Sequence, residues 1–190
     1  MKSGARALGI AESHRGNTST LAGAVVRADR VVEAFEFETC TVGGTDATAA
    51  IESLFASLDR ADVQYLFVAG IAPAWFNIVD LHSVTDTTGR PVLSVSFEES
   101  DGLGDAIREA FDGDAATRRL ATYYAQPDRR RLAIDAESVF VRSAGIDSDE
   151  ATAVVRAFTP DGSRPEPLRI ARRAARAGER FRSSLAGGGE

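Results

Sequence analysis

The chain has 190 residues, 44% of them hydrophobic, with 22 Lys and Arg against 28 Asp and Glu and a net charge of −6. It contains no apolar run of about 18 residues, which excludes a membrane-spanning helix, and its single cysteine, Cys40, excludes an internal disulfide and a cysteine-based zinc site. Lys2 is its only lysine, and this arginine-rich, acidic composition is typical of adaptation to very high salt. We expect a cytoplasmic protein with one domain over residues 1–185 and a disordered tail over 186–190.

The first part of the chain predicts three antiparallel strands and a helix. Residues 5–12 and 20–27 are apolar runs joined by a short polar loop. Phenylalanine and glutamate then alternate over residues 35–38, which is the period of a strand with one wet face. The glycine pair at 43–44 ends this strand, and apolar residues at helical spacing predict a helix over 46–58.

The segment over residues 65–80 is expected to hold the functional edge of the fold. Residues 65–68 form an uninterrupted apolar run, the pattern of a strand buried on both faces. Gly70 allows a sharp exit, and Pro73 suits the first turn of a helix. We predict that this helix carries Asn77 and Asp80 on one face, because they are three residues apart. Polar groups would then stand at the carboxyl edge of a sheet, where open α/β sheets bind ligands.

The rest of the chain predicts a mixed α/β fold. It contains two more strands, at 91–97 and 139–143, a loop at 126–131, and four helices, at 103–111, 114–124, 148–158 and 167–183. An antiparallel three-strand opening followed by helix, strand, helix and strand is the order of ribonuclease H-like folds. We therefore expect a mixed five-stranded sheet with flanking helices.

Two basic segments stand out on this acidic chain. Residues 164–182 contain seven arginines and two glutamates, and residues 118–131 contain five arginines and one aspartate. In the last predicted helix, Arg169 begins a stripe of arginines at helical spacing. This stripe favours a face that follows phosphates. The alternative is a solvated face paired with the acidic body of the protein.

Several segments together resemble the archaeal endonuclease dU family, distant relatives of endonuclease V, in a haloarchaeal-looking form. They cover nearly the whole chain in the family's order: LGIAES at 8–13, TVGGTDAT at 41–48, AGIAPAWFNIVD at 69–80, RPVLSV at 90–95, AGID at 144–147 and RPEPLRIA at 164–171. The resemblance implies a ribonuclease H-like fold. It also implies cleavage of DNA at or near deoxyuridine with Mg²⁺ or Mn²⁺, which carboxylates hold so that the ion can activate water.

The chain departs from the family at the acidic positions that this chemistry needs. Ala11 stands at the first-strand position, Gly43 at the start of the glycine-rich motif, and Ala69 at the end of the central strand. None of these side chains can ligate a metal ion. The usual metal site is therefore absent from the sequence, and no residues can be assigned as metal ligands.

Three other carboxylates are candidates for a rebuilt catalytic set. Glu12 follows Ala11, but adjacent strand residues point to opposite faces, so Glu12 would need a local bulge to replace it. Asp46 begins a predicted helix, where capping is the alternative role. Asp80 is predicted one turn inside its helix, where it could instead cap or pair with an arginine.

Three residues are candidates for substrate binding. Trp75 is the only tryptophan and stands where an extruded base could stack, the alternative being a ring half buried against the domain. Asn77 could contact a sugar, a base or the backbone of the turn. Arg169 could contact a phosphate.

The sequence leaves three functions open. The first is a metal-dependent DNA repair endonuclease that acts at deoxyuridine. The second is a catalytically inactive relative that binds damaged or single-stranded DNA, because three acidic positions are alanine or glycine. The third is a small-molecule binder at the same sheet edge. Whether the protein is an enzyme, and its oligomeric state, stay open at this point.

Overall fold

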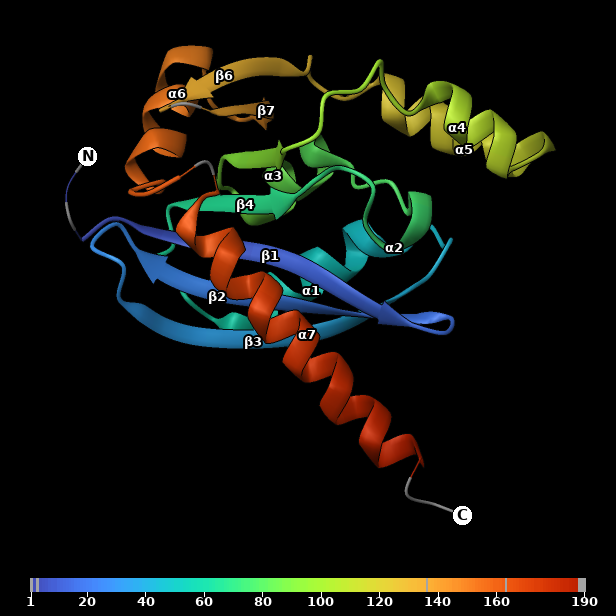
Figure 1. Cartoon of the computed structure of the whole chain (residues 1–190), viewed down its shortest axis with the longest axis horizontal. Coiled ribbons are helices and arrows are strands. Elements are labelled where there is room, and N and C mark those ends of the chain that lie inside the picture. Colours follow the sequence, from blue (N-terminus) through green and yellow to red (C-terminus); the bar gives the residue numbers. More distant parts are fainter. Residues whose placement is uncertain (1, 3, 136, 163, 188–190) are drawn as a thin grey trace.

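Seven strands form one sheet in the part of the chain that the structure describes, which is residue 2 and residues 4–135, 137–162 and 164–187. The computed structural model surrounds this sheet with helices (Figure 1). In chain order, the elements are β1 (Arg6–Arg15), β2 (Thr18–Arg27), β3 (Val32–Thr41), α1 (Ala47–Leu58), β4 (Tyr65–Ala69), α2 (Pro73–Phe76), α3 (Leu81–Thr88), β5 (Val92–Ser96), α4 (Gly104–Ala110), α5 (Gly113–Tyr124), β6 (Arg130–Ile134), β7 (Glu137–Ala144), α6 (Ser148–Ala157) and α7 (Glu166–Gly187).

The order of the strands across the sheet is β3-β2-β1-β4-β5-β7-β6. β1, β2 and β3 form an antiparallel meander, β4 and β5 run parallel to β1, and β7 and β6 form an antiparallel hairpin beside β5. Because β4 and β5 run in the same direction, their carboxyl ends meet at one edge of the sheet. We call the strand ends Ala69 and Ser96, with the loops that follow them, the carboxyl edge.

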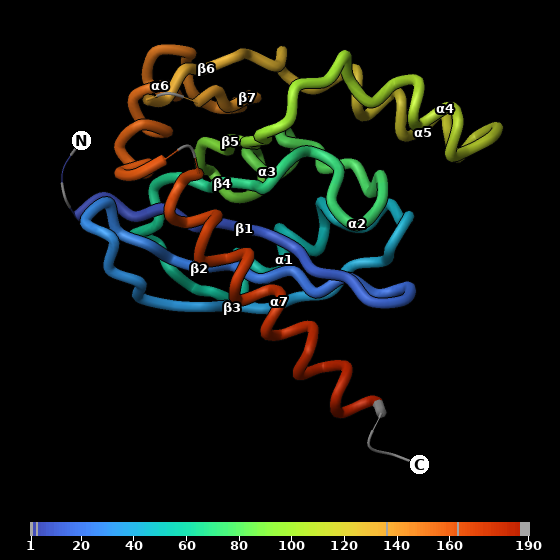
Figure 2. The backbone as a smooth tube through the Cα atoms, in the orientation of Figure 1, coloured from blue at the N-terminus to red at the C-terminus, as the bar shows by residue number. Residues whose placement is uncertain are grey.

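Helices cover both faces of the sheet. α7 crosses β1 and β2 on one face, while α1 and α3 lie on the other (Figure 2). The side chains of β1 alternate between these layers: Leu8 and Ile10 pack with Leu54 of α1, whereas Ala11 packs with Ala171 of α7. Apolar burial on both faces is the main force that holds the layers together.

α7 lies unusually close to β1 because of Gly9. A Cβ atom added at Gly9 would lie 2.2 Å from the carbonyl carbon of Pro167, so only glycine leaves room for the backbone at the start of the helix. This contact brings the arginine-rich helix against the sheet beside the carboxyl edge (Figure 1).

The mixed sheet with flanking helices is confirmed, but the expected number of five strands is wrong, because the strand predicted at 139–143, which is β7, and an additional strand, β6, both join the sheet. β6 begins inside the segment predicted as a loop at 126–131 and pairs with β7 as an antiparallel hairpin. The adjacent arginines at 130 and 131 hide the apolar alternation by which a strand is recognised. The predicted tail at 186–190 begins inside α7, which continues to Gly187, and residues 188–190 lie outside the described residues.

The predicted helix that would carry Asn77 and Asp80 on one face is also wrong. α2 is a single turn in which Ala74, Trp75 and Phe76 have positive φ angles of 48°, 56° and 58°. The chain then runs without helical structure over residues 77–80 before α3 begins. Left-handed backbone costs roughly 1–2 kcal/mol for each such residue, so the surrounding structure has to hold this turn in place.

Across the residues described, no helix combines the length and the apolar character that a membrane crossing requires.

Candidate functional site

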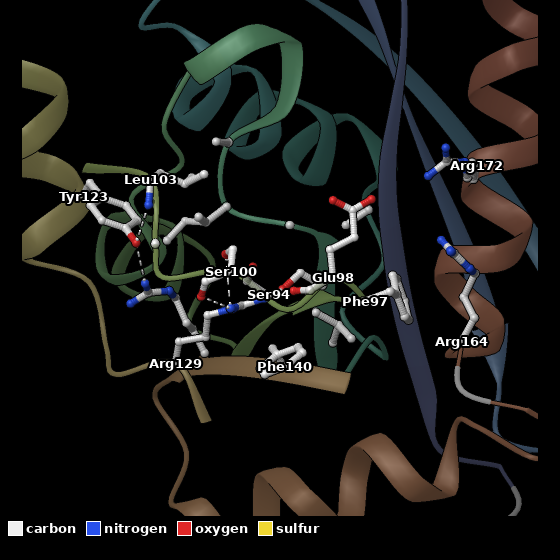
Figure 3. A pocket seen from close by; sticks show the side chains of 18 residues that line it. Ser94, Phe97, Glu98, Ser100, Leu103, Tyr123, Arg129, Phe140, Arg164 and Arg172 are labelled. Carbon is white, nitrogen blue, oxygen red and sulfur yellow. Dashed lines mark hydrogen bonds between the residues drawn. The ribbon is translucent and has the colours of Figure 1, made fainter. Parts of the chain in front are cut away.

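A pocket of about 430 Å³ opens at the carboxyl edge (Figure 3). Its floor is formed by the ends of β4 and β5 and by the β7 residues Phe140 and Arg142, and α5 contributes Tyr123 to its wall. The loops that follow β4 and β5, including residues 70–72, complete the lining. The pocket therefore occupies the place where open α/β sheets bind ligands.

Two of the arginines that line this pocket, Arg129 and Arg142, are held in place by hydrogen bonds to other lining residues. Arg129 donates to the Ser96 hydroxyl at 3.1 Å and to the Ser100 carbonyl at 3.1 Å, and its guanidinium lies 4.0 Å from the centre of the Phe140 ring. Arg142 donates to the Tyr123 hydroxyl at 3.2 Å. These contacts fix the loop after β5 and hold positive charge on one side of the pocket.

Two further arginines face the pocket from the α7 side. Figure 3 shows Arg164 and Arg172 together, with the Phe97 ring against Arg164. The Arg164 guanidinium lies 3.9 Å from the centre of that ring. Burial, and then the charges of Arg172 and Arg176, lower the pKa of Arg164. No ion pair among the described residues involves Arg164 or Arg172.

The balance of charge in the pocket is positive. Its lining contains four arginines and one carboxylate, that of Glu98. Guanidinium groups that lack a carboxylate partner can bind phosphate or another anion through several hydrogen bonds. The neighbouring rings of Phe97 and Tyr123 add flat apolar surface. This combination suits a ligand that carries both a phosphate and an aromatic ring.

Asn77 holds together the segments at the meander end of the same edge. Its Oδ1 accepts from the Ala47 N–H at 2.9 Å, and its Nδ2 donates to the Thr41 carbonyl at 2.9 Å and to Asp46 Oδ1 at 2.6 Å. The residue is fully buried. The amide therefore bonds to backbone, as one of the expected roles had it, but to residues 41 and 47 between β3 and α1 and not to the turn after β4.

Asp46 links the end of β3 to the start of α1. It is the N-cap residue of α1, as the alternative role required, but its side chain makes no capping bond. The carboxylate instead accepts from the Thr41 N–H at 3.1 Å and from the Thr41 hydroxyl at 2.8 Å. Burial acts to raise the pKa of Asp46, but the hydrogen bonds from Asn77 and Thr41 outweigh burial and lower it.

Asp80 is the N-cap of α3 and does not lie inside a helix. Its carboxylate accepts from the backbone N–H groups of His82 at 3.0 Å and Ser83 at 3.3 Å. Gln126 Nε2 also donates to it, at 3.2 Å. The capping alternative for Asp80 is therefore the arrangement that the structure shows.

Glu12 lies on the sheet face opposite Ala11. β1 pairs regularly with β2 at this point, with Glu12 opposite Leu21 and no bulge, and the Glu12 carboxylate accepts from the Ser19 hydroxyl. Burial, then Asp46 and Glu12, raise the pKa of the neighbouring Cys40 thiol to about 12. Both carboxylates therefore lie near one buried thiol, but Glu12 does not take the place of Ala11.

Ala11 and Ala69, which stand where the resemblance implies acidic residues, are neighbours. β1 and β4 pair in parallel with Ile10 opposite Val68, so Ala11 and Ala69 follow at the same level, and both pack in the apolar cluster with Ala171. Within the described ranges no three His, Cys, Asp or Glu residues gather as a metal-binding group. The donor set at this place does not fit Mg²⁺, which requires oxygen ligands.

The remaining substrate candidates have different surroundings. Arg169 pairs with Glu166 through two hydrogen bonds, one of them at 2.6 Å, so much of its charge is already compensated. Trp75 is 55% exposed and stands above Gly43. The catalytic and substrate-binding roles expected for the six candidate residues are not tested by these contacts and stay predictions.

Comparison with known proteins identifies the family. The endonuclease dU family profile matches residues 3–178. The UPF0215 protein of Pyrobaculum calidifontis is 33% identical over 174 residues, with 86% of this chain and 91% of that protein covered. The UPF0215 protein of Pyrobaculum aerophilum is 32% identical over 181 residues, with 94% and 96% covered. The chain belongs to the endonuclease dU family.

Solved structures show the same fold. A protein of unknown function from Archaeoglobus fulgidus superposes with a TM-score of 0.82 at 26% identity, covering 91% of this chain and 97% of that chain. Human endonuclease V gives a TM-score of 0.63 at 15% identity, with 94% and 86% covered. Endonuclease V of Ciona intestinalis, in complex with a 24mer DNA containing an inosine followed by a ribo-adenosine, gives 0.58 at 12% identity, with 93% and 86% covered.

We predict that Asn77→Ala lowers the free energy of unfolding by about 2–4 kcal/mol, because Ala47 N–H, Thr41 carbonyl and Asp46 all lose a buried partner. Asn17→Ala, in the exposed turn between β1 and β2, is the matched control. Chemical denaturation of both variants at one salt concentration measures the difference. Equal stability of the two variants would contradict the role given to Asn77.

We predict that Asp46 makes the stability of the protein depend on pH. The folded pKa of Asp46 is lowered, so its contribution to stability is complete above the ordinary aspartate pKa of about 4 and is lost as the pH falls through the lower folded value. Asp46→Asn should therefore flatten the fall in stability that begins as the pH drops below about 4, while Asp114→Asn, at an exposed position of α5, keeps the wild-type slope. Parallel curves for all three proteins would contradict this account.

Proposed function

We propose that this member of the endonuclease dU family binds DNA in the pocket at the carboxyl edge. The observation that carries the proposal is the pair Arg164 and Arg172, which face the pocket beside the Phe97 ring and take part in none of the ion pairs among the described residues. Arginines position phosphates of a nucleic acid, and aromatic rings accept its bases. A net acidic protein gains affinity for DNA only where such a local positive patch exists.

The comparisons support a nuclease-type scaffold. The family is named for an endonuclease, and a neighbouring endonuclease V structure contains DNA. The central strands, in the order β3-β2-β1-β4-β5 with a parallel β1, β4 and β5, support the expected ribonuclease H-like arrangement. Within this proposal the ligand is DNA that contains deoxyuridine or is single-stranded, and the pocket volume of about 430 Å³ is in the range of small-ligand sites.

We further propose that binding does not use the family's usual metal site. Two neighbouring alanines, Ala11 and Ala69, fill the place where carboxylates would hold Mg²⁺. The arginines of the pocket would instead compensate the phosphate charge directly. On this view the chain keeps the scaffold and its DNA-binding edge, and the usual hydrolytic site is lost.

Metal-dependent cleavage at deoxyuridine is the second candidate function. It is favoured by one observation: Glu12 and Asp46 accept from neighbouring groups of the meander, Glu12 from the hydroxyl of Ser19, which pairs with Cys40, and Asp46 from the hydroxyl of Thr41, the residue after Cys40. Two carboxylates near one point can share a divalent ion, provided that they release their present partners, Ser19 and Thr41. Mg²⁺ or Mn²⁺ would be the cofactor of this activity.

We predict that Arg164→Gln and Arg172→Gln each weaken binding of a labelled deoxyuridine oligonucleotide several-fold and reduce the salt slope of binding by about one. Arg156→Gln, an exposed arginine of α6 that does not line the pocket, is the matched control. Fluorescence anisotropy at several salt concentrations, each checked for a folded protein, measures the affinities. Wild-type affinity in both pocket variants would contradict the proposed site.

The same complexes distinguish the two candidate functions. A uracil-containing duplex and a single strand are incubated with the protein in EDTA, Mg²⁺ or Mn²⁺, and the products are separated on a denaturing gel. DNA binding without the usual metal site predicts that the protein binds DNA in EDTA and cleaves no strand with either metal. Metal-dependent nicking that is lost in Glu12→Gln and Asp46→Asn would establish metal-dependent cleavage instead.

A further inference from the structure

We infer that Trp75 is a preformed stacking platform for one unpaired nucleobase, which extends the proposed DNA site beyond the arginine pocket. The inference rests on the proposed function and adds to it the kind of DNA that the edge selects. Trp75 is the only tryptophan of the chain, and 55% of it is exposed. An indole ring normally loses most of its exposed area on folding, so its position on the surface requires an explanation.

The backbone around Trp75 has an unfavourable left-handed conformation, which contacts with the rest of the protein must stabilise. Ala74, Trp75 and Phe76 are three consecutive non-glycine residues with left-handed φ angles. L-residues visit this region singly, because the Cβ atom approaches a carbonyl oxygen. Outliers of this kind concentrate at functional sites, where the remaining structure holds them in place.

Three contacts hold the turn. The Gly43 N–H donates to the Ala74 carbonyl at 2.7 Å, and the Asn77 N–H donates to the Pro73 carbonyl at 3.1 Å. Arg119 Nε donates to the Phe76 carbonyl at 3.2 Å. The side chain of Ala74 is buried, so the turn is anchored while the next residue remains at the surface.

The indole ring of Trp75 packs against Gly43 and two phenylalanine rings. A Cβ atom at Gly43 would lie 3.0 Å from Cε3 of Trp75, so a larger residue there would push the ring away by a few tenths of an ångström, and the positive φ of Gly43 also favours glycine. The Phe111 ring lies 5.3 Å from the Trp75 ring and the Phe76 ring 6.2 Å from it. Arg119 stands 3.8 Å from the centre of the Phe111 ring and brings positive charge beneath this aromatic group.

The platform and the arginine pocket share the segment that follows β4. Ala72 lines the pocket, and Trp75 follows it by three residues, in α2. A strand whose phosphate is bound by Arg164 and Arg172 therefore has an aromatic surface further along the same edge. Stacking accepts any base but requires an unstacked one, so the platform selects single-stranded or locally unpaired DNA over regular duplex.

The single tryptophan provides a direct test. Wild-type fluorescence is titrated with a thymine oligonucleotide, with the same backbone carrying abasic sites, and with inorganic polyphosphate. We expect quenching by the first and little change with the other two, since these carry phosphate charge without bases. A duplex of equal length should quench less than the single strand.

Two substitutions separate the ring from the turn that presents it. Trp75→Gly removes the ring and accepts the positive φ at no steric cost, and it should weaken single-strand binding by about 5- to 100-fold. Trp75→Phe keeps an aromatic surface and should recover most of the affinity. Tyr124→Leu, which removes another exposed ring, 60% exposed on α5, is the matched control and should bind like wild type.

The outcomes distinguish this inference from the proposed function. Binding with unchanged tryptophan fluorescence and with wild-type affinity in Trp75→Gly would overturn the platform and leave the arginine pocket standing. Failure of any DNA to bind the wild type would overturn both. If Trp75→Gly changes only the oligomeric state of the protein, the exposed ring is a contact between copies, and the platform is likewise overturned.

Discussion

The carboxamide of Asn77 is the interaction on which the arrangement of the carboxyl edge depends. Asn77 is itself fully buried, and its carboxamide bonds to the first N–H of α1, the last carbonyl of β3 and the carboxylate of Asp46. A buried polar group is costly without its partner, so these three segments and the turn before Asn77 keep a fixed relation. The left-handed turn that displays Trp75 can persist because the residue that follows it is anchored so firmly.

Under the proposed function, guanidinium groups near this anchor do what metal-bound carboxylates would do at the usual site. A family named for an endonuclease is expected to hold carboxylates at strand ends, but here two small apolar side chains meet there and pack beneath α7. Positive charge has gathered at the same edge instead, in arginines stacked on Phe97, Phe140 and Phe111. An edge of this composition compensates phosphate charge with guanidinium groups, which suits recognition of DNA better than coordination of a divalent ion.

Much of this could be predicted from the sequence, for reasons that individual elements show. Apolar runs and phenylalanine–glutamate alternation indicated the meander, and the segments resembling endonuclease dU identified the family. The turn at 73–76 could not be predicted, because it depends on contacts with Gly43 and Arg119, which are distant in sequence, and on the anchoring of the adjacent Asn77 against residues 41–47. A ligand site at the carboxyl edge was expected, but its arginines were not assigned: the two basic segments pointed to phosphate, and only folding brings Arg129 and Arg164 into the lining of one pocket.

The most direct test of the central claim is a crystal structure of the protein with a short deoxyuridine-containing single strand and Mn²⁺, analysed by the anomalous signal of manganese. The account predicts a phosphate at Arg164 and Arg172, a base on the indole of Trp75, and no manganese beside Ala11 and Ala69. Manganese bound between Glu12 and Asp46, with the scissile phosphate against it, would contradict the account and show that a catalytic metal site has been rebuilt on this edge.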